Sequence, residues 1–280
     1  MENALRAQGV HIFETSAGAV AAVDELVVLQ SAFQPVFRCR RDRMEPVAFE
    51  ALARPFRGAS PLPPERYFDD LERERLGAIE QVVRHIHVRN AAHLPRGARR
   101  LFLNFHPSAF ESPARIEQDL RLLGADLRAI GISPADLVCE ITEQQEHAEE
   151  ALKDVVYLLR ARGYRIAVDD FGAGFADPGR VARLTPDIVK VDGALVRRHL
   201  ATPEGCVELG RLVEAFGRDG IQCVLEGLET LEQVERARRT GAHFLQGFAL
   251  APPQLAPGEF ASLIAAGRRH PELRLVKSFR

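Results

Sequence analysis

The sequence lacks the features that mark membrane, exported and nucleic-acid-binding chains. It contains no apolar run near the roughly 20 residues that a membrane-spanning helix needs, so we expect no membrane span. Its first residues include Glu2 and show no basic stretch followed by an apolar core, so we expect no export signal and a cytoplasmic location. The 37 Lys and Arg residues nearly balance the 39 Asp and Glu residues, which leaves no general attraction to nucleic acid or anionic lipid. We therefore expect no nucleic-acid partner, and an anionic ligand would have to be held by local charges.

Cysteine is scarce, and its spacing argues against two kinds of cross-linked site. The four cysteines form no CxxC pair, which favours reduced core thiols over a zinc site or a disulfide framework. They are Cys39, Cys139, Cys206 and Cys223. Hydrophobic residues make up 46% of the 280 residues and charged residues 27%, which is typical of a folded domain with a sizeable core.

What the sequence does contain is an alternation of short β-rich runs with helical patterns. The runs predict strands at Phe33–Cys39, Val47–Ala53, Leu101–Phe105, Leu137–Ile141, Arg165–Asp169, Ile188–Val191, Gln222–Leu225 and Phe244–Phe248. Helices are predicted at Pro113–Ala129, Ala148–Arg162, Val196–Gly217, Leu231–Thr240 and Pro257–Gly267. Eight strands with intervening helices favour an α/β fold, a closed (β/α)8 barrel of the TIM type.

One connection does not fit a fully parallel barrel. Only Arg40 to Pro46 separate the first two predicted strands, whereas a parallel crossover needs about a dozen residues or more. The first strand is therefore expected to run antiparallel to its neighbours, which places Gln34 beside their carboxyl ends.

The remaining segments give a simple division of the chain. Residues 1–30 are expected to be an N-terminal extension in which Ala19–Leu29 forms a helix, residues 31–268 to be the barrel, and residues 269–280 to be a tail. Gly58–Pro64 is predicted to be a loop because its prolines and glycine do not favour helix or strand.

Polar side chains lie in or directly after seven of the predicted strands, at the ends that a barrel gathers on one rim. They are Glu50, Asn104, Glu140, Asp169, Asp170, Lys190, Asp192, Glu226 and Gln246. Taken singly, Glu50 could be an outward-facing strand residue, Asn104 a turn former and Glu140 a helix cap. Their coincidence over seven strands favours a site on the rim where barrel enzymes place their active sites.

The same residues predict bound cations. Clustered carboxylates raise one another's pKa unless positive charge is present. Oxygen ligands without histidine or cysteine favour Mg²⁺ or Mn²⁺ over Zn²⁺. About five carboxylates suffice for two divalent cations, a recurrent arrangement in phosphodiester hydrolysis.

In order and approximate spacing, these residues resemble the motifs of the EAL phosphodiesterase family over residues 33 to about 265. The matching segments are Gln34-Pro35-Val36, Glu50-Ala51-Leu52-Ala53-Arg54, Asn104-Phe105-His106-Pro107, Glu140-Ile141-Thr142-Glu143, Asp169-Asp170-Phe171-Gly172-Ala173-Gly174-Phe175, Lys190-Val191-Asp192, Glu226-Gly227-Leu228-Glu229-Thr230 and Gln246-Gly247-Phe248. The resemblance implies hydrolysis of the second messenger cyclic di-GMP to linear pGpG.

The resemblance also implies roles for individual residues. One metal ion would be bound by Glu50, Asn104, Glu140 and Asp169, and a second by Asp169, Asp170 and Glu226. Lys190 would lie beside the attacking water and would form the catalytic set with Glu226 and Glu50. The implied substrate-binding residues are Gln34, Arg54, Asp192 and Gln246, and the implied loop-stabilising residues are Glu143 and Glu229. A plain salt bridge for Lys190 or Arg54, and a helix-end effect for Glu229, are the alternatives.

The chain departs from the family pattern after the double aspartate. Where the family commonly has Gly-Tyr-Ser-Ser-Leu, this sequence has Gly174-Phe175-Ala176-Asp177-Pro178-Gly179. In the family this loop is linked to metal binding and to homodimer contacts, so turnover and a homodimer through the loop after Asp170 stay open. His243 replaces a common aspartate and is expected to be a hydrogen-bonded structural residue. The alternatives to an enzyme of this family are a cyclic di-GMP receptor without turnover and an unrelated Mg²⁺-dependent barrel enzyme.

Overall fold

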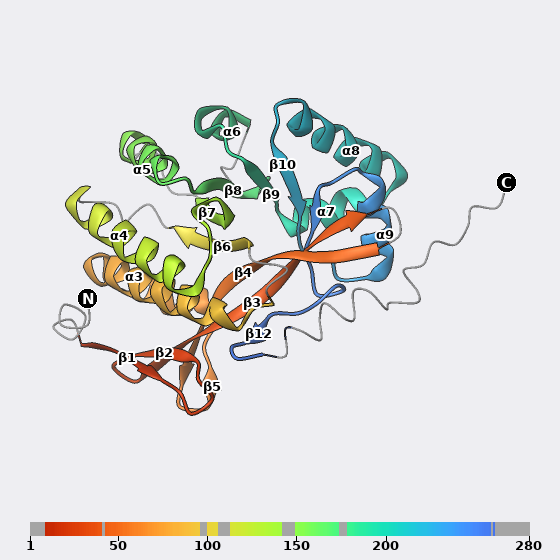
Figure 1. Ribbon diagram of the computed structural model, residues 1–280. Coiled ribbons are helices and arrows are strands. Elements are labelled where there is room, and N and C mark those ends of the chain that lie inside the picture. The colour runs from red at the N-terminus through yellow and green to blue at the C-terminus, as the bar shows by residue number, and fades with distance from the viewer. Residues whose placement is uncertain are drawn as a thin grey trace.

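A closed barrel of eight strands forms the centre of the protein. The computed structural model describes residues 9–40, 43–95, 100–105, 113–141, 149–173, 178–258 and 260. The barrel strands follow one another around the ring as β3-β11-β10-β9-β8-β7-β6-β4, and pairing of β4 with β3 closes it (Figure 1). Their bounds are β3 (Val27–Arg40), β4 (Arg43–Arg57), β6 (Arg100–Phe105), β7 (Leu137–Ile141), β8 (Arg165–Phe171), β9 (Ile188–Val191), β10 (Gln222–Leu225) and β11 (Phe244–Leu245). The predicted barrel is confirmed and each predicted strand corresponds to one of these, although β11 ends at Leu245 instead of Phe248 and β3 begins at Val27 instead of Phe33.

The first barrel strand runs against the others, as the short connection after it requires. β3 pairs antiparallel with both β4 and β11. The remaining neighbours in the ring, from β4 through β6 to β11, pair parallel. The carboxyl ends of the six strands from β6 to β11 therefore meet at one rim with the paired residues Gln34 and Glu50, which lie in the middle of the long strands β3 and β4.

Helices cover the outside of the barrel (Figure 1). They are α3 (Arg73–Asn90), α4 (Pro113–Ile130), α5 (Glu149–Ala161), α6 (Pro178–Leu184), α7 (Gly193–Leu200), α8 (Pro203–Arg218) and α9 (Leu231–Arg239). The three predictions that correspond to α4, α5 and α9 are confirmed within about two residues of each described end. The predicted helix Pro257–Gly267 lies mostly outside the described residues. None of the described helices is long and apolar enough to span a bilayer.

The prediction of one helix over Val196–Gly217 is wrong, because the chain forms α7 and α8 there. Thr202 has extended backbone geometry and its side chain accepts a hydrogen bond from the Gly205 amide, which starts α8. Pro203 occupies the first helical position, where its missing N–H costs nothing.

The barrel interior is filled by one apolar residue from each strand. These side chains form a separate buried cluster of Val36, Ala48, Phe102, Val138, Ala167, Ile188, Val224 and Phe244. A larger cluster packs the outer faces of the strands against the helices. Inner and outer residues alternate along each strand, as the period of two in a strand dictates. All four cysteines are free, and Cys139 and Cys223 are buried.

The N-terminal segment folds as β structure, so the predicted helix over Ala19–Leu29 is wrong. β1 (Val10–Glu14) and β2 (Val20–Asp24) form a hairpin, and β2 pairs with the start of β3. The apolar run is divided by a turn at Glu25 and Leu26, where Glu25 has φ +52°. This lobe lies beside α3 at one end of the long β3–β4 ribbon (Figure 1), with a small core of its own that includes Val20, Leu29 and Ile86.

Smaller elements complete the lobe and the barrel edge. The predicted loop Gly58–Pro64 contains the short strand β5 (Ser60–Pro61), which pairs with β4, and ends where α2 (Pro64–Asp69) begins. β12 (Gln254–Leu255) pairs antiparallel with β3. Short 3-10 helices occupy Ala91–His93 and Pro134–Asp136.

Candidate active site

The period of two in the strands places the polar side chains at the rim. Each of them lies two residues beyond an interior apolar residue in the direction of the rim, and so points into the barrel mouth. The pairs are Ala48 and Glu50, Phe102 and Asn104, Val138 and Glu140, Ala167 and Asp169, Ile188 and Lys190, Val224 and Glu226, Phe244 and Gln246, and, in the reversed strand, Val36 and Gln34. The rim layer is thus a direct continuation of the interior core.

Lys190 lies at the centre of this layer, with carboxylates around it. Its Nζ is 2.6 Å from Glu140 Oε1 and 2.9 Å from Glu226 Oε1. Asp169 Oδ1 lies at 3.0 Å and Glu50 Oε1 at 3.4 Å. Lys190 is only 2% exposed and Glu140 is fully buried. Four sequence positions spread over 177 residues therefore converge on one ammonium group.

The electrostatics of the cluster reflect an excess of negative charge. Burial acts to lower the pKa of Lys190, but attraction by Asp169, Glu140 and the other carboxylates outweighs it and raises the pKa well above its usual value. Burial raises the pKa of Glu140 and of Glu226 far above the usual range, and Lys190 offsets this only in part. The lysine is therefore protonated, and one ammonium is too little positive charge for the carboxylates around it.

A local irregularity of β8 brings two adjacent aspartates to the same rim. Neighbouring strand residues normally point to opposite faces, so Asp170 would face away from Asp169 in a regular strand. Here the pairing of β8 with β9 shifts register between Val168 and Phe171, and Asp170 has φ +53°. Bulges of this kind re-aim a side chain. One ligand atom each from Asp169, Asp170 and Glu226 lie within 4.8 Å of one another, as in a metal-binding group. Burial and the charge of Asp169 raise the pKa of Asp170 to about 6.

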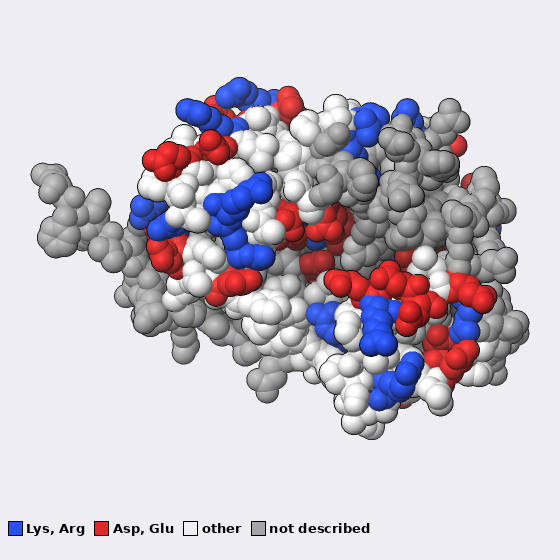
Figure 2. Space-filling model, turned by 180° about the vertical axis from the view of Figure 1, so that it is seen from behind, with Lys and Arg blue, Asp and Glu red and all other residues white. Residues whose placement is uncertain are grey.

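The residues of this cluster fit divalent cations. Among the described residues, Glu140 Oε2 and Gln246 Oε1 are buried acceptors without a hydrogen-bond donor. Acidic side chains gather in a hollow of the molecular face shown in Figure 2. An excess of negative charge in a hollow attracts cations. Buried oxygen atoms without donors, in a site with excess carboxylate, are what hard cations such as Mg²⁺ and Mn²⁺ bind.

Two glutamines connect Glu50 by hydrogen bonds to the segment that follows β11. Gln246 Nε2 donates to Glu50 Oε2 at 2.5 Å and lies 3.3 Å from Gln34 Oε1. Gln34 Nε2 in turn donates to the carbonyl of Ala251 at 3.1 Å. All three polar side chains are at most 8% exposed, and these hydrogen bonds hold Oε2 of Glu50 while Lys190 contacts its Oε1.

Comparison with known proteins agrees with this geometry. The model of the family described as "EAL domain" matches residues 25–253, most of the chain. The chain belongs to the EAL domain family. The resemblance inferred from the motifs is confirmed.

Relatives of this EAL chain carry names from cyclic di-GMP signalling. It is 33% identical over 125 residues to the probable cyclic di-GMP phosphodiesterase PdeA of Escherichia coli, covering 44% of this chain and 17% of PdeA. It is 32% identical over 155 residues to the cyclic di-GMP phosphodiesterase RocR of Pseudomonas aeruginosa, covering 55% of this chain and 38% of RocR. The chain thus spans well under half the length of these relatives. The structure of Klebsiella pneumoniae BlrP1 in a manganese/cy-diGMP complex has a TM-score of 0.71 and 27% identity, over 88% of this chain and 59% of that one.

The other predicted site residues of the EAL chain have varied surroundings. Asn104 is exposed at the end of β6 and pairs in register with Glu140. Arg54 Nη1 donates to its neighbour's carbonyl, Ala53 O, at 2.8 Å, and burial lowers the pKa of Arg54 while Glu50 opposes that shift. Asp192 Oδ1 accepts hydrogen bonds from the Ala194 and Leu195 amides at 2.9 and 3.0 Å, which makes Asp192 the cap of α7.

The two residues predicted to stabilise loops, Glu143 and Glu229, and the structural residue His243 have different outcomes. Glu143, like most of the loop 174–179, lies outside the described residues. Glu229 is exposed and its Oε1 lies 3.3 Å from Arg197 Nη1. The structural role predicted for His243 is confirmed, because its Nδ1 accepts a hydrogen bond from the Cys223 amide at 3.2 Å.

Sequence reasoning missed Arg197, which lies on α7 and joins this helix to the segment after β10. Arg197 Nη1 donates to Gly227 O at 3.1 Å, directly after Glu226. Gly227 has φ +63°, and a Cβ there would lie 2.7 Å from Gly193 Cα and 2.7 Å from Arg197 Nη1. No motif distinguishes Arg197 from other helical arginines, so only the fold reveals this contact.

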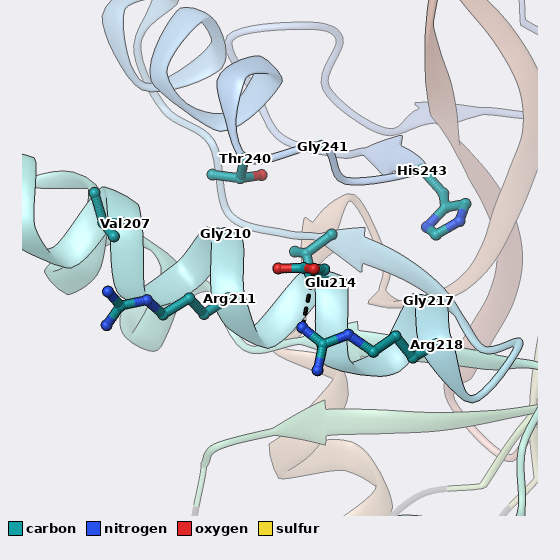
Figure 3. Close-up of a pocket in the computed structure, with 10 residues that line it drawn as sticks. Val207, Gly210, Arg211, Glu214, Gly217, Arg218, Thr240, Gly241 and His243 are labelled. Carbon is teal, nitrogen blue, oxygen red and sulfur yellow. Dashed lines mark ion pairs between the residues drawn. The ribbon is translucent and has the colours of Figure 1, made fainter.

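A surface pocket of the EAL chain lies apart from the carboxylate cluster. It runs between α8 and the turn before β11, with Arg211 and Glu214 on one side and Thr240 on the other (Figure 3). Glu214 and Arg218 form an ion pair there at 2.9 Å. No predicted catalytic, metal-binding or substrate-binding residue lines this pocket.

Proposed function

We propose that this chain hydrolyses cyclic di-GMP to linear pGpG, with two divalent cations, Mg²⁺ or Mn²⁺, bound by its carboxylate cluster. The observation that carries the proposal is the convergence of Glu50, Glu140, Asp169 and Glu226 on Lys190, beside Asp170. The names of RocR and PdeA and the cyclic di-GMP and manganese in the BlrP1 structure support the same assignment.

The cluster supplies enough oxygen ligands for both cations. We assign Glu50, Asn104, Glu140 and Asp169 to one, and Asp169, Asp170 and Glu226 to the other. Bound cations would lower the pKa of a coordinated water and stabilise negative charge on the phosphoryl oxygens.

Lys190 acts in this proposal as a proton donor in hydrogen bonds and not as a base. In the absence of metal ions, attraction by the four carboxylates outweighs burial and raises the pKa of Lys190 well above its usual value, so that its Nζ presents three N–H donors. Such a group orients an attacking water or a phosphoryl oxygen and offsets charge without moving a proton. Proton acceptance falls to the carboxylates, with Glu226 and Glu50 as the candidates.

The substrate contacts follow from charge and position. Arg54 lies on β4 beyond Glu50, and its guanidinium can bind a phosphate through two N–H groups. Gln34 and Gln246 hold Glu50 and are proposed to position water or substrate. Asp192 uses Oδ1 for its helix cap, so Oδ2 is the atom proposed to accept from the substrate.

We extend the proposal to the parts of the chain around the site. The protein would act in the cytoplasm, and a homodimer would form through the loop after Asp170. Glu143 would stabilise that loop, and Glu229 would hold the segment after Glu226 through its ion pair with Arg197.

A direct assay tests this function. The purified protein is mixed with cyclic di-GMP and MnCl₂ or MgCl₂, and the products are separated by chromatography. The expected product is pGpG, its formation is abolished by EDTA, and Glu50→Gln lowers turnover by about 10²-fold or more. Glu214→Gln, an exposed acid on α8, is the matched control and keeps full activity.

Two results would contradict the proposal. Saturable binding of cyclic di-GMP with no pGpG in the presence of either metal would make the protein a receptor. Absence of both turnover and thermal protection by cyclic di-GMP would refute cyclic di-GMP as the ligand of this EAL chain. Unchanged activity in Glu50→Gln would refute the assignment of that ligand.

A further inference from the structure

The opposite mouth of the barrel carries a basic counterpart of the rim. The period of two that brings carboxylates to one mouth brings arginines to the other. Arg100 lies two residues before the interior Phe102, Arg165 lies two before Ala167, and Arg38 lies two after Val36 in the reversed strand. Three arginines from three strands therefore face the amino-terminal mouth, and each is only partly exposed.

An aromatic ring forms the floor under two of these arginines. Arg38 Cζ lies 5.2 Å and Arg100 Cζ 5.9 Å from the ring centre of Phe244, which is 1% exposed in the barrel interior. Both guanidinium groups are thus held over one ring by cation–π contacts. Both arginines lie on barrel strands, Arg38 on β3 and Arg100 on β6, so the barrel sets the position of their backbone.

Three buried polar atoms at this mouth have no hydrogen-bond partner among the described residues. Arg100 Nε and Nη1 are buried and have no hydrogen-bond acceptor among the described residues, and Gln222 Oε1 in the same layer has no donor. In the described part of the chain, no carboxylate forms an ion pair with Arg38, Arg100 or Arg165. Buried donors without an acceptor are rare in native proteins and indicate a water or ion.

Among the described residues of this mouth, the positive charge of the three arginines exceeds the negative charge of Asp136 and Asp187. Burial lowers the pKa of Arg100, Arg165 and Arg38 lower it further, and Asp136 and Asp187 offset the shift only in part. Asp187 is itself engaged, because its Oδ2 accepts a hydrogen bond from the Ile166 amide at 2.9 Å. Bringing like charges together in a partly buried layer is unfavourable unless an anion joins them.

We propose that the amino-terminal mouth binds a phosphoryl anion between Arg38, Arg100 and Arg165. Guanidinium groups present paired N–H donors that match the oxygens of phosphate, and a phosphate carries a charge of about −1.5 to −2 at pH 7, more than a carboxylate. The anion is either free inorganic phosphate or the phosphoryl group of a mononucleotide. This site is separate from the carboxylate cluster and stands whether or not the chain turns over cyclic di-GMP.

Anion-dependent stabilisation of the full chain tests the site. Thermal unfolding is followed in EDTA, so that no bound metal recruits phosphate to the carboxylate rim. Inorganic phosphate is titrated against chloride at equal ionic strength, and GMP is titrated in a second series. The expected result is saturable protection by phosphate or GMP that chloride does not give. GMP binding more than about tenfold tighter than phosphate would identify a nucleotide as the source.

Neutralising variants separate a ligand site from a structural role. Arg100→Gln and Arg165→Gln are each expected to weaken phosphate protection about tenfold, since each removes charge-assisted hydrogen bonds. Without phosphate, the melting temperature of Arg165→Gln should equal or exceed that of the wild type, because repulsion is relieved. Arg211→Gln, on the exposed face of α8, is the control and should respond to phosphate as the wild type does.

Two outcomes would overturn the inference. One is equal stabilisation of the wild type by phosphate and chloride, which would mean that the arginines only pack over the Phe244 ring and bind no specific anion. The other is that Arg165→Gln and Arg38→Gln bind phosphate as tightly as the wild-type protein does. These two variants also replace Arg100→Gln if Arg100→Gln does not fold.

Discussion

Replacing Lys190 with methionine tests whether this lysine stands in for metal charge. Methionine has a similar length and no charge, so Lys190→Met keeps the volume of the side chain and removes the ammonium from among the carboxylates. The nearest of these, Glu140, is 0% exposed, whereas the side chains of Asp169 and Glu226 are 11% and 16% exposed. Water can therefore reach the latter two but not Glu140.

The expected cost follows from that difference in exposure. Removing one partner of a buried ion pair leaves an uncompensated charge and costs about 3–5 kcal/mol. Because the side chains of Asp169 and Glu226 are partly exposed, the loss for Lys190→Met should come mainly from Glu140, which must either stay charged in a buried site or take up a proton. The free energy of unfolding in EDTA should therefore fall by about 3–5 kcal/mol.

A divalent cation should then replace the missing charge. A ligand at 100 times its Kd stabilises the folded state by about 2.7 kcal/mol, so saturating Mn²⁺ should recover most of the deficit. Urea unfolding in EDTA and in MnCl₂ measures both quantities, and Lys153→Met, an exposed lysine on α5, is the control. Equal stability of Lys190→Met and wild type in EDTA would refute the view that the cluster depends on this ammonium.

Three further predictions concern the surroundings of the site. Arg197→Ala should lower kcat more than it raises KM, because the backbone next to Glu226 loses its hydrogen bond to Arg197. Arg198→Ala on the same helix is the control and should change neither value, and Arg197→Lys should restore part of the rate. Gly247→Ala should destabilise the protein by about 1–3 kcal/mol or more in urea unfolding, since the new Cβ would lie 2.2 Å from a backbone oxygen. Burial holds the pKa of His87 at about 3 against 6.5 in the unfolded chain. Only the unfolded state binds a proton between these values, so stability should fall with falling pH by up to about 1.4 kcal/mol per unit, and His87→Gln should flatten that slope.

The barrel and its rim could be predicted because one periodicity governs both. Alternation along each strand fixes which side chains enter the interior, and the residue two positions further must then enter the mouth, as Val138 and Glu140 illustrate. The short hairpin connection likewise decided the direction of β3. Asp170 is the exception, because its orientation depends on a bulge in β8 that could not be predicted from the residue pattern.

The N-terminal lobe and the helix caps could not be predicted in the same way. Ala19–Leu29 is apolar enough for a buried helix, and its turn at Glu25 and Leu26 carries none of the usual glycine or asparagine signals. Pairing with the long β3 decided its structure, which is a tertiary effect. The capping role of Asp192 was also missed, although an aspartate before a helix is a common cap.

The two-residue step from core to rim has a consequence for insertions and deletions. A change of one residue within a strand would exchange its inner and outer faces, so the rim residue Glu226 would leave the barrel mouth and the core residue Val224 would leave the barrel interior at the same time. Loss of chemistry and loss of packing would then be one event. Insertions and deletions should therefore be tolerated better in loops than in strands. Within a strand, a change of one residue would disturb the barrel core and the rim together, and so would affect stability and function at once.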